Sequence, residues 1–148
     1  MPSDLATAGI IGLILLVSGV ALLALAIWFR RGRSAAARRW ARRRSIDQTA
    51  TYAVVEGFAL ACTPMLAQTL IVAGVAVPLA ALLGPDSVAA TVLFWVLLLL
   101  EPTLWTVMFV LITYRWILPL WMYPAWLRDV RRAEVEHLRA QQGLPPSR

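Results

Sequence analysis

The sequence contains no lysine, one cysteine and one histidine, and these shortages exclude several kinds of chemistry. A single cysteine, Cys62, rules out an intrachain disulfide, and its apolar neighbours favour a small buried hydrophobic side chain. His137 lies far from Cys62 in the sequence, so neither a thiolate–imidazole pair nor a zinc site is predicted. No glycine-rich phosphate loop or dinucleotide fingerprint occurs. We therefore expect no metal, no cofactor and no catalytic activity.

Charged residues are also scarce: they make up 15% of the 148 residues, whereas 60% are hydrophobic. Three apolar stretches exceed the roughly 18 residues that mark a membrane span. A soluble domain of this length has no need of such runs. The sequence therefore predicts an all-α polytopic membrane protein with three transmembrane helices, a basic inner loop and a cytoplasmic amphipathic C-terminal helix.

The first apolar stretch does not have the charge order of a secretory signal, because Arg30 and Arg31 follow it instead of preceding it. We interpret it as an uncleaved first span with its amino terminus outside. The predicted membrane domain covers residues 1–126, and a helical tail covers 127–148. The membrane domain is divided into spans at about residues 5–29, 52–83 and 88–114, a basic inner loop at 30–51 and an interfacial aromatic segment at 114–126.

Two local features shape the predicted spans. Ala8, Gly9 and Gly12 have the small side chains that let two membrane helices approach closely. In the second span, Pro64 leaves the carbonyl group of Leu60 without its intrahelical partner, so we expect a kink there.

Eight of the fourteen arginines lie between Arg30 and Arg44. Basic residues in short loops stay on the inner side of a membrane, so this loop predicts an outer amino terminus and a cytoplasmic carboxyl terminus in a bacterial plasma membrane. The net charge of +6 would also suit nucleic acid, but arginines beside spans meet anionic headgroups instead. The alternatives are a loop that only sets the orientation of the chain and a loop that docks a partner. The predicted lipid- or partner-binding residues are Arg38, Arg39, Trp40, Arg42, Arg43 and Arg44.

Acidic residues inside spans are costly, and each is a candidate functional site. Glu101 lies about 20 Å of helix from Val88 and about 21 Å from Arg115, near the middle of the third span. The structural interpretation is a neutral glutamic acid hydrogen-bonded to a neighbouring helix. The functional interpretation is a proton or cation relay. Glu56 lies close enough to the inner end of its span to reach the headgroup region.

Counting outward from the predicted turn at residues 84–87 pairs polar residues across the second and third spans. Gln68 and Glu101 lie at nearly equal depth, so the sequence predicts that they share hydrogen bonds. By the same count Glu56 and Arg115 lie within about 3 Å of depth at the inner end. With straight helices the two pairs do not form together, and Gln68–Glu101 is the favoured pair.

These features predict a non-catalytic accessory or scaffold subunit of a larger inner-membrane complex. Three spans make a thin bundle, so we expect other membrane subunits or further copies of the chain as partners, with no nucleic acid. A homo-oligomeric ion- or proton-conducting protein that uses Glu101 is the alternative. A third hypothesis is a surface-charge sensor that uses the arginine loop.

The predicted topology is tested by thiol labelling of single cysteines in a Cys62→Ala chain. We expect Ser87→Cys to react with a membrane-impermeant reagent added from outside, because it lies in the outer turn. Ala36→Cys, among the arginines, should react only after the membrane is opened. Labelling of Ser87→Cys from the cytoplasmic side would invert the predicted orientation.

Overall fold

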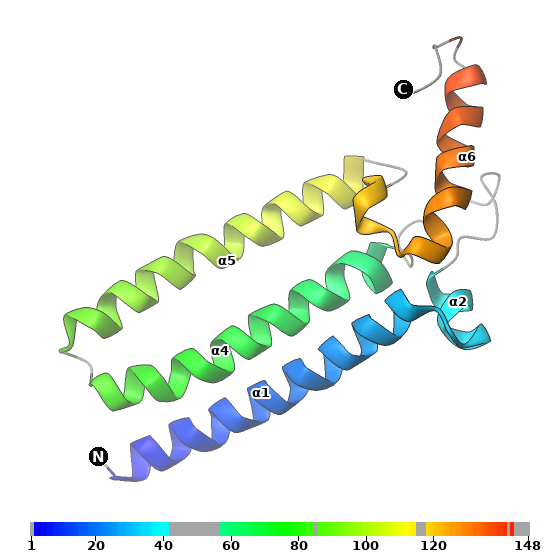
Figure 1. Cartoon of the computed structure of the whole chain (residues 1–148). Helices are drawn as coiled ribbons and strands as arrows, with labels where there is room; N and C mark the ends of the chain where they lie inside the picture. The colour runs from blue at the N-terminus through cyan, green and yellow to red at the C-terminus, as the bar shows by residue number, and fades with distance from the viewer. Residues whose placement is uncertain (1, 42–56, 85, 115–117, 142, 144–148) are drawn as a thin grey trace. The chain divides into compact units, whose positions relative to one another are not determined.

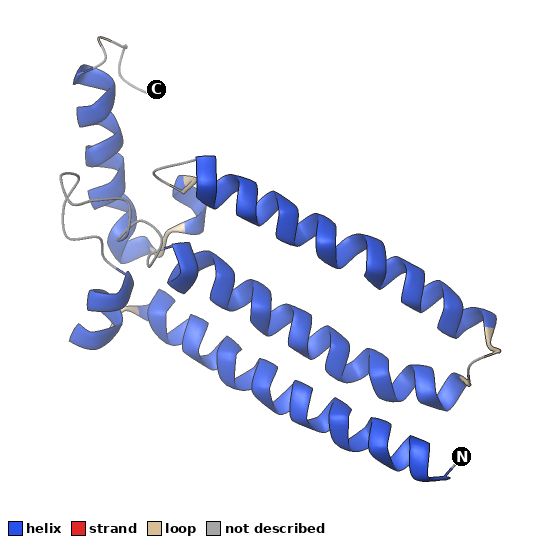
Figure 2. Ribbon diagram, turned by 180° about the vertical axis from the view of Figure 1, so that it is seen from behind, coloured by secondary structure: helices blue, strands red, loops and turns tan. Residues whose placement is uncertain are grey.

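The computed structural model describes residues 2–41, 57–84, 86–114, 118–141 and 143 (Figure 1). Within these residues every regular element is helical, and three helices are long and apolar enough to cross a membrane (Figure 2). This confirms the predicted all-α architecture with three candidate spans. The elements are α1 (Pro2–Arg31), α2 (Ala35–Ala41), the π-helix η1 (Phe58–Cys62), α4 (Thr63–Leu83), α5 (Val88–Tyr114), the 3-10 helix η2 (Leu120–Met122) and α6 (Ala125–Gln141).

The contacts divide the chain into two compact units. The bundle unit comprises residues 1–25 and 63–109, which are most of α1, all of α4 and most of α5. The Arg–aromatic unit comprises residues 26–62 and 110–148, with α2, η1, η2 and α6.

In the bundle unit α1 lies beside α4, and glycines bring the two backbones close together (Figures 1 and 2). A Cβ atom added to Gly12 would lie 2.7 Å from the carbonyl oxygen of Gly74, and one added to Gly74 would lie 2.9 Å from that of Gly12. Seven residues further along α1, a Cβ atom added to Gly19 would lie 2.8 Å from the Ile71 side chain and 3.0 Å from the carbonyl oxygen of Ala67. No larger residue fits at these contacts, so the glycines set the helix separation.

The close-packed face differs in part from the predicted one. Gly12 lies in the contact, but a Cβ atom added to Gly9 would meet nothing within 4 Å. The contact instead follows Gly12 and Gly19 on α1, and Ala67 and Gly74 on α4, each pair seven residues apart. A seven-residue spacing keeps both members of a pair on one side of a helix, so the contact continues for two turns. The prediction is therefore right for Gly12 and wrong for Gly9.

Prolines shape the helices in two ways. The irregularity predicted at Pro64 is a π-helical segment, η1, directly before α4, and Leu60 within it is almost fully buried. Pro64 follows η1 directly within the continuous helical run Phe58–Leu83, so its missing N–H group leaves one carbonyl group of η1 without a helical partner. Pro102 lies in the middle of α5, and the helix continues through it, with the Thr106 hydroxyl donating to the Pro102 carbonyl oxygen at 2.7 Å.

The three spans differ in how much of their surface other residues cover. In the apolar 18-residue stretch of α1, 17% of the residues are buried, and in the corresponding stretch of residues 58–83 the buried share is 11%. In the corresponding stretch of α5 no residue is buried. Phe94, Trp95 and Leu99 are examples, each more than half exposed. The third span thus has one half-buried face, which includes Leu93, Leu97 and Trp105, and its other faces are exposed.

The glycine contact predicts a contrast between two leucine substitutions on α1. We expect Gly12→Leu to lower the free energy of unfolding by about 1–3 kcal/mol, because the added side chain overlaps the α4 backbone. Gly9→Leu adds the same atoms where there is space, and should change it by less than about 0.5 kcal/mol. Unfolding of both variants by increasing dodecyl sulfate in mixed micelles measures the difference. Equal losses would show that this face does not hold α1 against α4.

Candidate functional site

Four polar side chains meet between α4 and α5 in the bundle unit. The Gln68 amide nitrogen donates to Glu101 Oε1 at 2.7 Å, and the Thr69 hydroxyl donates to Glu101 Oε2 at 2.6 Å. The Trp105 indole nitrogen in turn donates to Thr69 Oγ1 at 3.1 Å. We name Gln68, Thr69, Glu101 and Trp105 the Glu101 cluster.

Helical spacing explains how the Glu101 cluster assembles. Glu101 and Trp105 are four residues apart on α5 and share one face, while Gln68 and Thr69 are consecutive on α4. Glu101 lies thirteen residues from each end of α5 (Val88–Tyr114), at the middle of the helix. The predicted contact between Gln68 and Glu101 is confirmed, and its role in relay or assembly stays a prediction.

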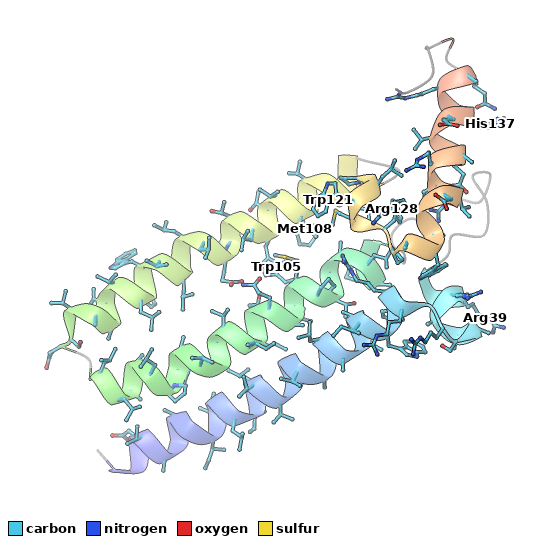
Figure 3. The ribbon with its side chains drawn as sticks, in the orientation of Figure 1. Arg39, Trp105, Met108, Trp121, Arg128 and His137 are labelled. Carbon is cyan, nitrogen blue, oxygen red and sulfur yellow. The ribbon has the colours of Figure 1, made fainter. Side chains whose placement is uncertain are left out.

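Thr69 and Trp105 were not among the predicted site residues. Trp105 stands one turn after Glu101, and this spacing was a signal in the sequence. Figure 3 shows Trp105 on the side of α5 that faces α4. Thr69 had no comparable signal, because a threonine in a span commonly bonds to its own backbone. Thr103 does so here, donating to the Leu99 carbonyl oxygen at 2.6 Å.

The donors of the Glu101 cluster come from Gln68, Thr69 and Trp105. An indole N–H group only donates, so Thr69 accepts from Trp105, and the Thr69 hydroxyl also donates to Glu101. Both carboxyl oxygens of Glu101 therefore act as acceptors toward α4. A carboxylate offers about four acceptor positions, and the two contacts occupy two of them.

The other predicted intramembrane and basic residues are placed only in part. Glu56, Arg115 and the predicted binding residues Arg42, Arg43 and Arg44 lie outside the described residues. Trp40 belongs to α2, but its side chain is not among those described. Arg39 is exposed on α2 (Figure 3).

Arg38 contacts its own chain in the Arg–aromatic unit. Its Nε atom donates to the Gly32 carbonyl oxygen at 2.5 Å, and its guanidinium lies over the Trp126 ring, 5.9 Å from the centroid. The Trp126 indole nitrogen donates to the Arg30 carbonyl oxygen at 3.2 Å. Gly32 has a positive φ of 56°, and any Cβ atom there would overlap the Trp126 ring. Trp126 thus connects the start of α6 to the end of α1.

Tyr123 is the centre of a second group of contacts in the same unit. Its hydroxyl accepts from the backbone N–H of Leu118 at 3.0 Å, and its carbonyl oxygen accepts from Arg128 at 3.2 Å. The Arg131 guanidinium lies 5.7 Å from the centroid of the Tyr123 ring and pairs with Glu134. Arg131 is only 1% exposed, so the tail helix buries a charged residue.

An apolar groove of about 270 Å³ lies between α4 and α5. It occupies the part of the bundle unit between the Glu101 cluster and the turn at Gly84. Small residues form much of its α4 wall, and larger ones form its α5 wall. The lining residues are Ala73, Ala76, Val77, Ala80, Ala90, Leu93, Phe94, Leu97 and Leu98.

The residues described above are the only guide to function. Comparison with protein families, curated proteins and solved structures gives no match for this chain. Within the described residues, no group of three or more histidine, cysteine or acidic side chains is placed to hold a metal ion. The features that bear on function are therefore the Glu101 cluster, the groove, the exposed faces of α5 and the Arg–aromatic unit.

Two threonine substitutions separate hydrogen bonding between helices from bonding within one helix. We expect Thr69→Val to lower the free energy of unfolding by about 0.6–1.7 kcal/mol, because it removes the hydroxyl between Trp105 and Glu101. Thr103→Val is the matched control, since its hydroxyl bonds only to its own helix, and it should have a negligible effect. Unfolding in mixed micelles measures both. A Thr69→Val protein as stable as the control would mean that the Thr69 hydroxyl does not help to join α4 to α5.

Proposed function

We propose that the protein is a non-catalytic accessory or scaffold subunit of a larger membrane complex, with α5 as its docking helix. The observation that carries this proposal is the absence of any buried residue in the apolar window of α5. Membrane helices associate through close packing of complementary surfaces. Apart from its half-buried face toward α4, the surface of α5 is open to a partner helix.

The Glu101 cluster supports a structural part for Glu101 within this proposal. Both of its carboxyl oxygens are bonded to side chains of α4 in the same chain, so it requires no acceptor or donor from another subunit. Docking on α5 would then depend on the shape of its apolar faces, while Glu101 keeps α4 and α5 aligned.

The membrane setting belongs to the same proposal. The chain sits in a bacterial plasma membrane with its amino terminus outside and its carboxyl terminus in the cytoplasm, and α6 is an amphipathic cytoplasmic helix. Residues 30–44 meet anionic headgroups. Arg31, Arg33 and Arg39 are described residues of this range that are exposed and can do so. Arg38, which is bonded to Gly32 and lies over Trp126, would instead hold the loop in place.

A homo-oligomeric proton- or ion-conducting protein is the alternative. The specific observation in its favour is the series of hydrogen bonds from Trp105 through Thr69 to Glu101, at mid-span. A titratable group at this depth is a typical component of a proton pathway. On this proposal further copies of the chain would complete the pathway around Glu101.

Photocrosslinking on α5, combined with two substitutions of Glu101, tests both proposals. A photoreactive residue at Leu99, which is 67% exposed, should give adducts with a larger membrane protein. The same residue at Leu97, which is half-buried on the side of α5 that faces α4, should give far fewer. Glu101→Gln, which keeps hydrogen bonding, should leave these adducts intact, and Glu101→Leu should reduce them. The purified chain in liposomes should conduct no protons.

The opposite pattern would favour the conducting alternative. In that case Leu99 crosslinks to a second copy of the chain, the purified protein conducts protons, and Glu101→Gln removes the proton flux while the oligomer survives. That result would overturn the accessory proposal.

A further inference from the structure

The apolar groove and the Glu101 cluster belong to the same interface between α4 and α5. On α5, Leu97 and Leu98 line the groove, and Glu101 follows four and three residues later on the same face. This spacing places Glu101 about 4.5–6 Å beyond them along the helix. On α4, Ala73 lines the groove and Thr69 precedes it by one turn. Glu101 is not itself a lining residue, but it therefore lies about one helical turn beyond the lining residues, at the end of the groove away from Gly84.

The bundle unit supplies no positive side chain for this carboxyl group. Residues 1–25 and 63–109 contain no arginine, lysine or histidine. A charged carboxylate at mid-span is costly unless a cation accompanies it. Two of its acceptor positions remain after the bonds from Gln68 and Thr69. Among the described residues, no hydrogen bond reaches the side-chain oxygen of Gln68, which is a further acceptor beside it.

From this geometry we propose that the groove and the Glu101 cluster bind a lipophilic ammonium compound. Its ammonium group donates to Glu101 and to the side-chain oxygen of Gln68, and the ring of Trp105 adds an aromatic surface suited to a cation. Its alkyl body lies in the groove, which runs for about 12 Å of helix between Ala90 and Leu98. The alanines of the α4 wall leave the space that the alkyl body fills.

Charge complementarity favours this occupant over a lipid tail or a helix of a second copy. A lipid tail is uncharged at mid-span and leaves the remaining acceptors of Glu101 unused. A second copy has no basic residue in its own bundle unit. Its arginines belong to residues 30–44 and 115–148, beyond the ends of the apolar runs. An amphiphilic amine brings both the positive charge and the apolar body to the same place.

The test uses the full chain in nanodiscs of neutral phosphatidylcholine, so that the lipid does not itself attract cations. The probe is a decylamine with a photoreactive diazirine in its alkyl chain, and the reference is the corresponding decanol. We expect the amine to label the groove peptides of α4 and α5 about tenfold more than the alcohol, which corresponds to about 1.4 kcal/mol. Mass spectrometry of the digested protein maps the labelled residues.

Three variants assign this labelling to the site. Glu101→Gln should reduce amine labelling to the level of the alcohol. Alcohol labelling of this variant should stay unchanged, and that result shows that the groove is intact. Ala76→Phe should abolish labelling by both probes because it fills the groove. Ala81→Phe makes the same change at an exposed position of α4 and should affect neither.

The proposal is overturned if the amine labels Glu101→Gln as strongly as the unaltered chain, or if Ala76→Phe leaves amine labelling intact. It is also overturned if the label maps outside the groove. Because the experiment uses the chain alone, its outcome is independent of whether α5 docks onto a larger protein.

Discussion

A carboxyl group in the hydrocarbon layer must find its hydrogen-bond partners inside the protein, because no water replaces a missing one. Glu101 finds them on α4, where Gln68 and Thr69 each donate to one of its oxygens, and Trp105 holds the Thr69 hydroxyl in place. This requirement fixes the alignment of α4 with α5. A shift of one residue would rotate the donors by about 100° and leave the acid unsatisfied.

The two sides of α4 use different means of helix association. Toward α1, contact depends on small residues, since Gly74 and Ala67 let the backbones of the two helices approach. Toward α5, contact is made by polar side chains, and the space beyond them stays open as the groove. Close packing and interhelical hydrogen bonds are the two main sources of cohesion in membranes. Here each acts on a separate face of one helix, so either can be changed by substitution without removing the other.

The sequence was sufficient for features set by length and depth. The apolar runs gave the three candidate spans, and α5 occupies the predicted residues 88–114 because a turn precedes it and a basic residue follows it. The contact between Gln68 and Glu101 was also predictable, since a short turn leaves two antiparallel helices little freedom in depth. Rotation about each helix axis was not predictable, because packing decides it. For that reason the sequence did not single out Thr69, and the burial of Arg131 beside Tyr123 depended on tertiary contacts that no local pattern shows.

The contact between Trp126 and the end of α1 joins residues that are synthesised far apart in time. The indole donates to the Arg30 carbonyl oxygen, 96 residues earlier in the chain. At a synthesis rate of about 5–20 residues per second, about 5–20 seconds separate the appearance of the two groups. During that interval Gly32 and Arg38 lack the ring that they later contact, although the first apolar helix has already been made. The contacts of Trp126 in the Arg–aromatic unit therefore form only after all three apolar helices have been translated.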